Sequence, residues 1–251
     1  MVELVVLGSS ASVPDAEHDT VSLVLRGADW AVLVECGGSP IQKLAQLGVG
    51  LEDLRAVILS HRHPDHIYGL PALVQGLWIG GREAPLPVYG PVQALDRARA
   101  LLELLELADR EGMFAVEWHP VPLRQGREVG SWGDVRVSAA PVVHGDNDTL
   151  ALRFENTATG RAIVYSADTE PCDAVVQLAA GADLLIHEAT GERPGHSTPA
   201  DAAEVAREAG AEQLALIHYP VRGVNLEAWR LRASEFPRPV TLAREGDRYR
   251  L

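Results

Sequence analysis

Four side chains of the kinds that bind metal ions fall within six residues of this chain. His61, His63, Asp65 and His66 follow the apolar run AVILS, which predicts a strand that ends just before them. In an extended segment residues 61 and 63 point the same way, and Pro64 then bends the chain so that the next two ligands begin a new turn. One short loop at the end of a strand therefore presents four candidate metal ligands to a small volume.

Three more candidate ligands each follow another apolar, strand-like run. His144 follows VRVSAAPVV, Asp168 follows AIVYSA and His218 follows LALI. A lone histidine after a strand is more often a core or surface residue, but seven such residues in this arrangement are hard to produce by chance. The four side chains of the first loop cannot all reach one tetrahedral ion without strain. We therefore expect two divalent metal ions, zinc by preference with manganese or iron as alternatives, because imidazole and carboxylate suit all three.

The overall charge limits the partners of the chain. Asp and Glu number 35 against 22 Lys and Arg, so the net charge is −13, and Lys43 is the only lysine. This balance argues against a broad nucleic-acid contact, which needs a basic surface. Two cysteines are too few for a disulfide framework. The first ten residues resemble a strand more than a signal peptide, and no apolar stretch is long enough to span a membrane, so a cytoplasmic protein without a membrane partner is expected.

Apolar runs and helical patterns alternate along the chain. Strands are expected at 2–7, 21–26, 31–35, 56–59, 86–89, 135–139, 150–154, 162–166, 184–186 and 214–217, and helices at 41–47, 70–78, 92–108, 200–209 and 227–233. This mixture suggests two sheets with helices packed outside them, although propensity alone does not exclude a doubly wound sheet. Without an internal repeat or linker, residues 1–251 are expected to form a single domain.

The motifs and their order resemble the metallo-β-lactamase superfamily. HRHPDH at 61–66 matches the HxHxDH signature of that superfamily. Five later segments are similar to its ribonuclease Z branch and to related phosphodiesterases: PVVH at 141–144, SADT at 166–169, HEAT at 187–190, GHST at 195–198 and LIHYP at 216–220. The match extends from the first strand to about residue 223. The resemblance implies an α/β (α+β) protein, a four-layer αββα sandwich with its site at one edge.

The resemblance also assigns the seven ligands to two ions. It implies a first group of His61, His63 and His144, a second group of Asp65, His66 and His218, and Asp168 as the bridge between them. Asp65 is expected to orient the attacking water as well.

The HEAT and GHST segments imply a catalytic pair. His196 would face the leaving group and Glu188 would support it, because an imidazolium oriented by a carboxylate can donate a proton to a leaving alkoxide. From the residues alone, a helix cap at Glu188 and a loop histidine at 196 would be the simpler interpretation, and the resemblance favours catalysis. His187 is expected to pack or to orient its neighbours.

Two departures from the family pattern affect the expected substrate. The branch usually shows SGDT, and here Ala167 replaces the glycine. Members that process transfer RNA usually carry a long Gly-rich, basic arm between the third metal-binding histidine and the bridging aspartate. Here the short segment between His144 and Asp168 reads as two strands and a turn. The machinery for catalysis is therefore expected, and the device for holding transfer RNA is not.

The predicted function is a dinuclear metal-dependent hydrolase, a phosphodiesterase for small phosphodiesters or nucleotides. One alternative is a transfer-RNA 3′-end endonuclease that lacks the arm and uses a homodimer, with Arg82, Arg97 and Arg99 as candidate RNA contacts. Another is a lactone or thioester hydrolase, which the catalytic pair disfavours because a good leaving group has less need of an acid. A metal-stabilised binding module is disfavoured because a structural site needs only four ligands.

Overall fold

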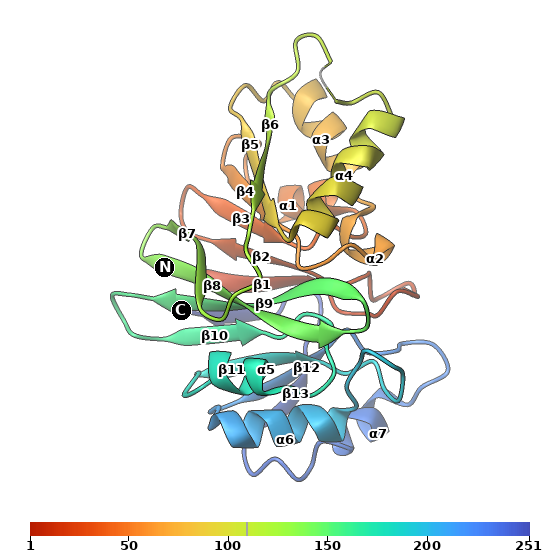
Figure 1. Cartoon of the computed structure of the whole chain (residues 1–251), viewed down its shortest axis with the longest axis vertical. Coiled ribbons are helices and arrows are strands. Elements are labelled where there is room, and N and C mark those ends of the chain that lie inside the picture. Colours follow the sequence, from red (N-terminus) through yellow and green to blue (C-terminus); the bar gives the residue numbers. More distant parts are fainter. Residues whose placement is uncertain (109) are drawn as a thin grey trace.

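Two seven-stranded sheets lie face to face, and helices cover the outer face of each (Figure 1). The arrangement is that of a computed structural model, which describes residues 1–108 and 110–251. The first sheet has the order β14-β1-β2-β3-β4-β5-β6 and the second has the order β13-β12-β11-β10-β9-β8-β7. The predicted four-layer αββα sandwich is therefore confirmed.

The strands of the two sheets divide the chain near its middle, except that the last strand returns to the first sheet. The first sheet contains β1 (Glu3–Gly8), β2 (Ser22–Arg26), β3 (Ala31–Val34), β4 (Leu54–Ile58), β5 (Leu86–Gly90), β6 (Val116–Pro120) and β14 (Arg248–Arg250). The second contains β7 (Arg127–Trp132), β8 (Val135–His144), β9 (Asn147–Asn156), β10 (Ala162–Tyr165), β11 (Leu184–Glu188), β12 (Leu214–Ile217) and β13 (Val240–Leu242).

Central strands are buried on both faces, which explains why they form continuous apolar runs in the sequence. In β1, Leu4 and Val6 belong to the core between the sheets, whereas Val5 belongs to the core beneath the helices. β12 alternates in the same way between the core of the sandwich and the core beneath the second layer of helices. Successive side chains of a strand point to opposite faces, so every position of such a strand has to be apolar.

Half of each sheet is parallel. The strands β3 to β6 are parallel neighbours in the first sheet, and β10 to β13 are parallel neighbours in the second. Parallel strands end at the same edge of a sheet, where active sites of α/β proteins usually lie. The loops that follow these strands are thereby gathered at one edge of the sandwich.

The helices form the two outer layers. Those near the first sheet are α1 (Pro40–Gln46), α2 (Pro64–Ile67), α3 (Leu70–Ile79) and α4 (Val92–Leu104), and those near the second are α5 (Asp173–Leu178), α6 (Pro199–Ala209) and α7 (Leu226–Leu231). The expected start of α6 is confirmed: Thr198 and Asp201 form a capping box and Pro199 occupies the first turn. None of the helices in the described part of the chain is long and apolar enough to cross a membrane.

Several elements differ from the expectation. The strands β6, β7, β13 and β14 and the helices α2 and α5 were not predicted. All four of these strands are edge strands, and β6, β7 and β14 carry exposed charged residues, so that they lack an apolar run. The helix expected over 92–108 ends at Leu104, because Glu106 adopts a left-handed φ of 55° and turns the chain away.

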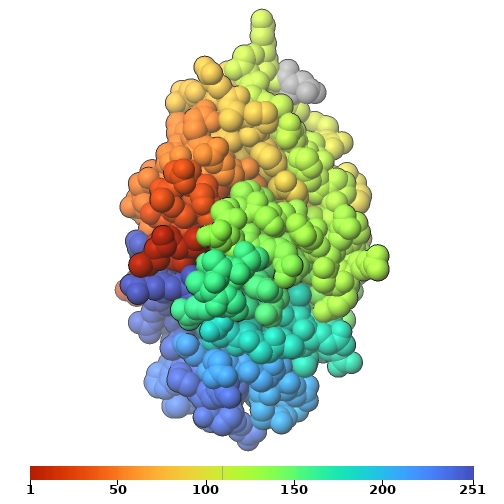
Figure 2. Space-filling view, turned by 90° about the vertical axis from the view of Figure 1, so that its left-hand side faces the viewer, coloured from red at the N-terminus to blue at the C-terminus, as the bar shows by residue number. Residues whose placement is uncertain are grey.

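The two ends of the chain lie side by side. β1 pairs with β14 in antiparallel register, and Figure 2 shows the red N-terminal segment against the blue C-terminal one. The Glu245 carboxylate accepts hydrogen bonds from the backbone N–H groups of Ser9 and Asp19. These contacts fasten the loop between β1 and β2 to the end of the chain.

Candidate metal centre

All seven predicted metal ligands are brought together at the edge where the parallel strands end. The HRHPDH segment leaves β4 and forms the one-turn helix α2, with Pro64 in its first turn. His144 ends β8, Asp168 follows β10 and His218 follows β12. The expected turn after residue 63 therefore exists, and it directs Asp65 and His66 toward the second sheet's ligands.

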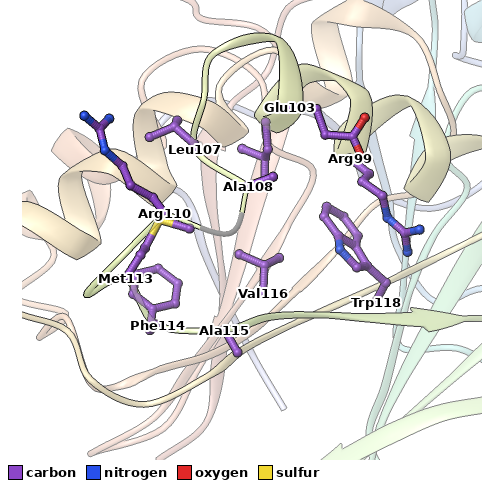
Figure 3. Close-up of a pocket in the computed structure, with 11 residues that line it drawn as sticks. Arg99, Glu103, Leu107, Ala108, Arg110, Met113, Phe114, Ala115, Val116 and Trp118 are labelled. Carbon is purple, nitrogen blue, oxygen red and sulfur yellow. The ribbon is translucent and has the colours of Figure 1, made fainter.

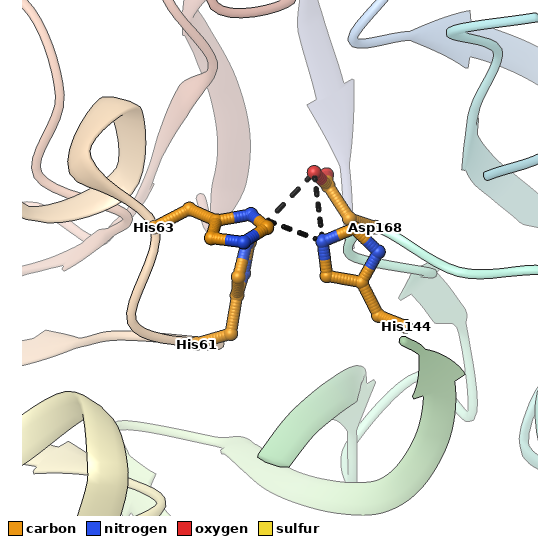
Figure 4. Close-up of side chains that lie close together, drawn as sticks. All are labelled: His61, His63, His144 and Asp168. Atoms are coloured by element: carbon orange, nitrogen blue, oxygen red, sulfur yellow. Dashed lines mark hydrogen bonds and ion pairs between the residues drawn. The ribbon is translucent and has the colours of Figure 1, made fainter. Parts of the chain in front are cut away.

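The first group lies around the ends of β4 and β8 (Figure 4). His63 Nδ1 lies 3.1 Å from His144 Nε2. The Nε2 atoms of His61 and His144 each lie 3.8 Å from Asp168 Oδ2. Ligands at about 2.0 Å from a tetrahedral zinc lie about 3.3 Å from one another, so these separations are compatible with a single ion between the four side chains.

The second group lies beside the first and shares Asp168 with it. Asp65 Oδ2 is 3.4 Å from His218 Nε2 and 3.8 Å from His66 Nε2. Asp168 Oδ2 is 3.5 Å from His66 Nε2, and Asp168 Oδ1 is 3.5 Å from His218 Nδ1. One carboxylate thus contacts both groups, which is the arrangement that a bridging ligand requires.

Buried polar atoms at this edge support a metal site. Among the described residues, His61 Nε2, both ring nitrogens of His66 and Asp168 Oδ1 are buried and have no hydrogen-bond partner. A buried polar atom without a partner costs about 1–3 kcal/mol. Imidazole nitrogens and a carboxylate that converge in this way offer the donor set for divalent ions such as zinc. The residues therefore fit the metal ions that the sequence predicted.

Outer contacts fix the orientation of three of the histidine rings. His61 Nδ1 lies 2.9 Å from Ser60 Oγ, and His144 Nδ1 lies 2.6 Å from the backbone oxygen of Gly195. His218 Nδ1 lies 2.8 Å from Thr190 Oγ1. Such contacts hold the second ring nitrogen of a metal-binding histidine and so aim the first one at the ion.

Glu35 is a residue at this site that sequence reasoning missed. It is fully buried, and its Oε1 lies 3.3 Å from His66 Nδ1. The hydroxyl of Tyr165 and the backbone N–H of Ser60 donate to the same carboxylate. The signal was present in the sequence, because Glu35 is a charged residue that closes an apolar strand in the same way as the predicted ligands.

Two imidazoles of the first group, His61 and His63, have lowered pKa values that favour the neutral ring. Desolvation, helped by the neighbouring His66, lowers the pKa of His61 well below its ordinary value. Desolvation and the neighbouring His144 also lower the pKa of His63. Because neutral imidazole is the form that binds a metal ion, these two rings need not lose a proton first near neutral pH.

In the second group the carboxylates dominate. Desolvation would lower the pKa of His66, but Asp168, Glu35 and Asp65 outweigh it and raise that pKa well above its ordinary value. The pKa of His218 is also raised, because Asp168 and a hydrogen bond to Asp65 outweigh desolvation. Desolvation opposes ionisation of Asp168, yet the rings of His218 and His66 hold its pKa well below the usual range.

The predicted catalytic pair is in contact. His196 Nδ1 lies 2.9 Å from Glu188 Oε1, and the same carboxylate accepts hydrogen bonds from the backbone N–H groups of Thr169, Thr190 and Ser197. Glu188 therefore joins the loop that follows β10 to the loop between β11 and α6, in addition to orienting the histidine. Since Nδ1 faces the carboxylate, Nε2 is the ring nitrogen that is left for a ligand. His187 is buried beside this pair, in keeping with a packing role.

Strained backbone occurs at three strand ends of the site. Glu35, Ala167 and His218 have φ values of 63°, 53° and 51°, in the left-handed region that favours glycine. Each of the three follows a different strand. Glu35 and His218 themselves have side chains at the metal site, and Ala167 directly precedes Asp168. Residues in such conformations persist only where the surrounding structure holds them, and they occur often at functional sites. Ala167 occupies the position where the family pattern has glycine, so that glycine would serve this backbone conformation.

The metal edge opens into a pocket of about 380 Å³, lined by His63, Asp65, Asp168, His196 and His218. A larger cavity of about 670 Å³ lies between α4 and β6 (Figure 3) and is lined by none of the predicted ligands. There Arg99 stacks over Trp118, with 5.4 Å between the guanidinium carbon and the ring centroid.

Two of the arginines considered as RNA contacts are engaged elsewhere. Arg82 is buried and donates to the backbone oxygens of Leu51, Ala84 and Pro85, so its guanidinium is not exposed for contact with RNA. Arg99 lines the larger cavity instead of the metal pocket.

Comparison with known proteins identifies the family. The β-lactamase superfamily domain matches residues 31–219. A ribonuclease Z of Methanothermobacter thermautotrophicus is 30% identical, with 96% of this chain and 94% of the relative covered. A ribonuclease Z of Mycobacterium bovis is 32% identical, with 94% and 93% covered.

Solved structures agree with this assignment. The metallo-β-lactamase fold protein YhfI of Bacillus subtilis superposes with a TM-score of 0.80 at 27% identity, over 99% of this chain and 98% of that one. Human tRNase Z, short form, gives 0.79 at 24% identity over 98% of both chains, and a diphosphatase of the PhnP family gives 0.76 at 20% identity over 100% and 98%, so both share the fold. The chain is therefore a metal-dependent hydrolase that belongs to the metallo-β-lactamase superfamily, in its ribonuclease Z-like branch.

Proposed function

We propose that this chain is a dinuclear phosphodiesterase that acts on small phosphodiesters or nucleotides. The observation that carries the proposal is the contact of Asp168 with both ligand groups, directly beside the His196–Glu188 pair. Seven ligands divided in this way suit two ions, and the nitrogen and oxygen donors suit zinc, with manganese or iron as alternatives. Divalent ions held there would polarise the phosphoryl oxygens and lower the pKa of the attacking water.

The side chains around the ligands supply the remaining chemistry. The Asp65 carboxylate, which lines the pocket, accepts a hydrogen bond from the attacking water and orients it. His196 donates the proton of Nε2 to the leaving alkoxide, while Glu188 holds Nδ1 and stabilises the imidazolium before transfer. A dedicated acid supports phosphodiester hydrolysis over lactone or thioester hydrolysis, where the leaving group needs less help.

Pocket size and charge support a small substrate. A volume of about 380 Å³ lies at the lower end of the range for small-molecule sites. The net charge of −13 repels a long polyanion. Lys43, the only lysine, is paired with Asp19 at 2.7 Å and is therefore engaged within the protein.

Processing of transfer-RNA 3′ ends is the second candidate, because the curated relatives are named ribonuclease Z. Against it, the alignment with the Methanothermobacter relative extends over 299 positions, more than the 251 residues of this chain, so that relative contains segments that this chain lacks. The segment between the third histidine and the bridging aspartate holds only β9, β10 and their turns, which leaves no room for an arm. A homodimer would have to supply the missing RNA contacts.

The test compares kcat/KM for thymidine 5′-(4-nitrophenyl phosphate), a lactone and a precursor transfer RNA at moderate salt. We expect efficient hydrolysis of the phosphodiester, slow hydrolysis of the lactone and little cleavage of the RNA. Elemental analysis should give about two metal equivalents per chain. Site-specific removal of the RNA 3′ trailer at nanomolar substrate would favour the endonuclease instead, and preferential lactone turnover would overturn phosphodiester chemistry altogether.

A further inference from the structure

We infer that Arg193 and Arg222 form an anion subsite at the metal pocket, and that the preferred substrate is a nucleotide with a second phosphate beside the scissile diester. The inference rests on the proposed phosphodiesterase function and specifies its substrate class. Both arginines line the same pocket as His196 and His218. They reach it from two different loops, one after β11 and one after β12.

Each arginine is attached to a segment that carries a site residue. The backbone oxygen of Arg193 accepts a hydrogen bond from the backbone N–H of His196 at 3.1 Å. Arg222 lies in the loop that leaves His218, and its Nε donates to the backbone oxygen of Pro14 at 2.9 Å. That contact fixes the base of the Arg222 guanidinium and leaves its terminal N–H groups for a ligand.

Both guanidiniums lack an acidic partner. Both arginines are exposed. Within the described residues Arg193 makes no side-chain hydrogen bond or ion pair, and Arg222 makes no ion pair. The neighbouring Arg232 is paired with Glu192 at 3.0 Å, and Arg230 with Glu227. The acidic side chains of Glu192 and Glu227 therefore pair with other arginines and not with the two at the pocket.

The pocket's lining matches a phosphorylated nucleoside. Val13, Pro220 and Val221 add apolar surface to the lining of the same pocket. Guanidinium groups bind phosphate through paired, charge-assisted hydrogen bonds. Two guanidiniums without an acidic partner provide positive charge at the pocket of a chain whose net charge is −13. They suit one additional phosphate, whereas the small pocket and the overall charge disfavour an extended polyanion.

The test uses two chromogenic esters that differ only in the second phosphate. Thymidine 5′-(4-nitrophenyl phosphate) has the scissile diester alone, and thymidine 3′-phosphate 5′-(4-nitrophenyl phosphate) has one more phosphate. Wild-type enzyme should hydrolyse the second ester with a kcat/KM at least about tenfold higher, chiefly through KM, because charge-assisted hydrogen bonds to one phosphate contribute that much. Arg193→Ala and Arg222→Ala should each reduce this ratio, and the double variant should bring it to about one.

Arg207→Ala is the matched control, since Arg207 is an exposed arginine of α6 that pairs with Glu204 away from the pocket. It should keep the wild-type ratio. A second readout without turnover is calorimetric binding of thymidine 3′,5′-bisphosphate against thymidine 5′-phosphate, where the arginine variants should lose the preference for the bisphosphate.

The outcomes separate the two proposals. Equal hydrolysis of both esters by the wild type, or a ratio that survives in the double variant, overturns the anion subsite and leaves the phosphodiesterase intact. If neither ester is hydrolysed but the bisphosphate binds in an arginine-dependent way, the subsite stands and the proposed reaction fails. Absence of both hydrolysis and selective binding overturns both.

Discussion

The two ligand groups at the metal edge use different physical means to prepare for an ion. In the first group desolvation keeps His61 and His63 neutral, and His63 is only half buried. In the second group carboxylates raise the pKa values of His66 and His218, and the buried Glu35 supports His66 from behind. The first group therefore relies on burial of uncharged rings and the second on fixed charge. A substitution that affects only burial or only charge should therefore change the metal affinity of one group more than that of the other.

Removal of the shared carboxylate should have the largest effect. We expect Asp168→Ala to lose metal from both groups and to reduce kcat/KM at least about 10⁴-fold, because both the attacking water and the leaving oxygen lose their stabilisation. Elemental analysis and turnover measure this, with circular dichroism as a check on folding. Retention of two metal equivalents would mean that each group holds its ion without Asp168 and that the groups are independent.

His196→Ala should separate catalysis from metal binding. Its ring lies against those of His144 and His218, with centroids 4.8 and 5.9 Å apart, so it contacts one histidine of each group. We expect turnover to fall about 10²- to 10⁴-fold, the usual range for a general acid, with two metal equivalents retained. The loss should be smaller for a nitrophenolate leaving group, which needs no proton. An equal loss with good and poor leaving groups would contradict the acid role, and loss of metal would assign the ring to a ligand group.

Glu35→Gln should weaken the second group alone. The substitution keeps the size of the side chain but removes the charge behind His66, so the second group should lose about 10- to 100-fold in metal affinity. Stepwise release of zinc to a chelating indicator measures the two affinities separately. Ser60→Ala is the matching change behind His61, and it should have a smaller effect on the first group because it removes a neutral contact. An equal loss of affinity for both ions in Glu35→Gln would show that the two groups do not differ in their use of charge and burial.

Ala167→Gly should have the smallest effect. Left-handed backbone costs a non-glycine residue about 1–2 kcal/mol, and the greater freedom of glycine in the unfolded chain offsets about 0.4–1 kcal/mol of any relief. We therefore expect a gain of at most about 1 kcal/mol in the free energy of unfolding, measured by urea denaturation, with metal content unchanged. The control Ala206→Gly, inside α6, should destabilise by about 1 kcal/mol. A loss of stability in Ala167→Gly would indicate that the methyl group packs usefully beside Asp168.

The sequence could predict the central strands and the ligands that follow them, because buried strands form apolar runs and the ligands stand at their ends. It could not predict the edge strands, where one side is solvated: β14 reads Arg-Tyr-Arg and carries no hydrophobic signal. The end of α4 was also hidden, because Glu106 takes a conformation that glycine normally marks. Glu35 stands at the end of an apolar strand as the predicted ligands do, but it belongs to no motif, and only the fold shows that it lies behind His66.

The contribution of both sheets to the metal edge has a thermodynamic consequence. His61, His63, Asp65 and His66 come from the first sheet's loops, whereas His144, Asp168 and His218 come from the second. An ion held between them binds only when the two halves of the chain are docked, so its binding energy is added to the cohesion of the sandwich. By mass action this linkage amounts to about 4.1 kcal/mol for each ion at a free concentration of about 1,000 Kd. The chain's resistance to heat should therefore rise and fall with the supply of metal in its surroundings.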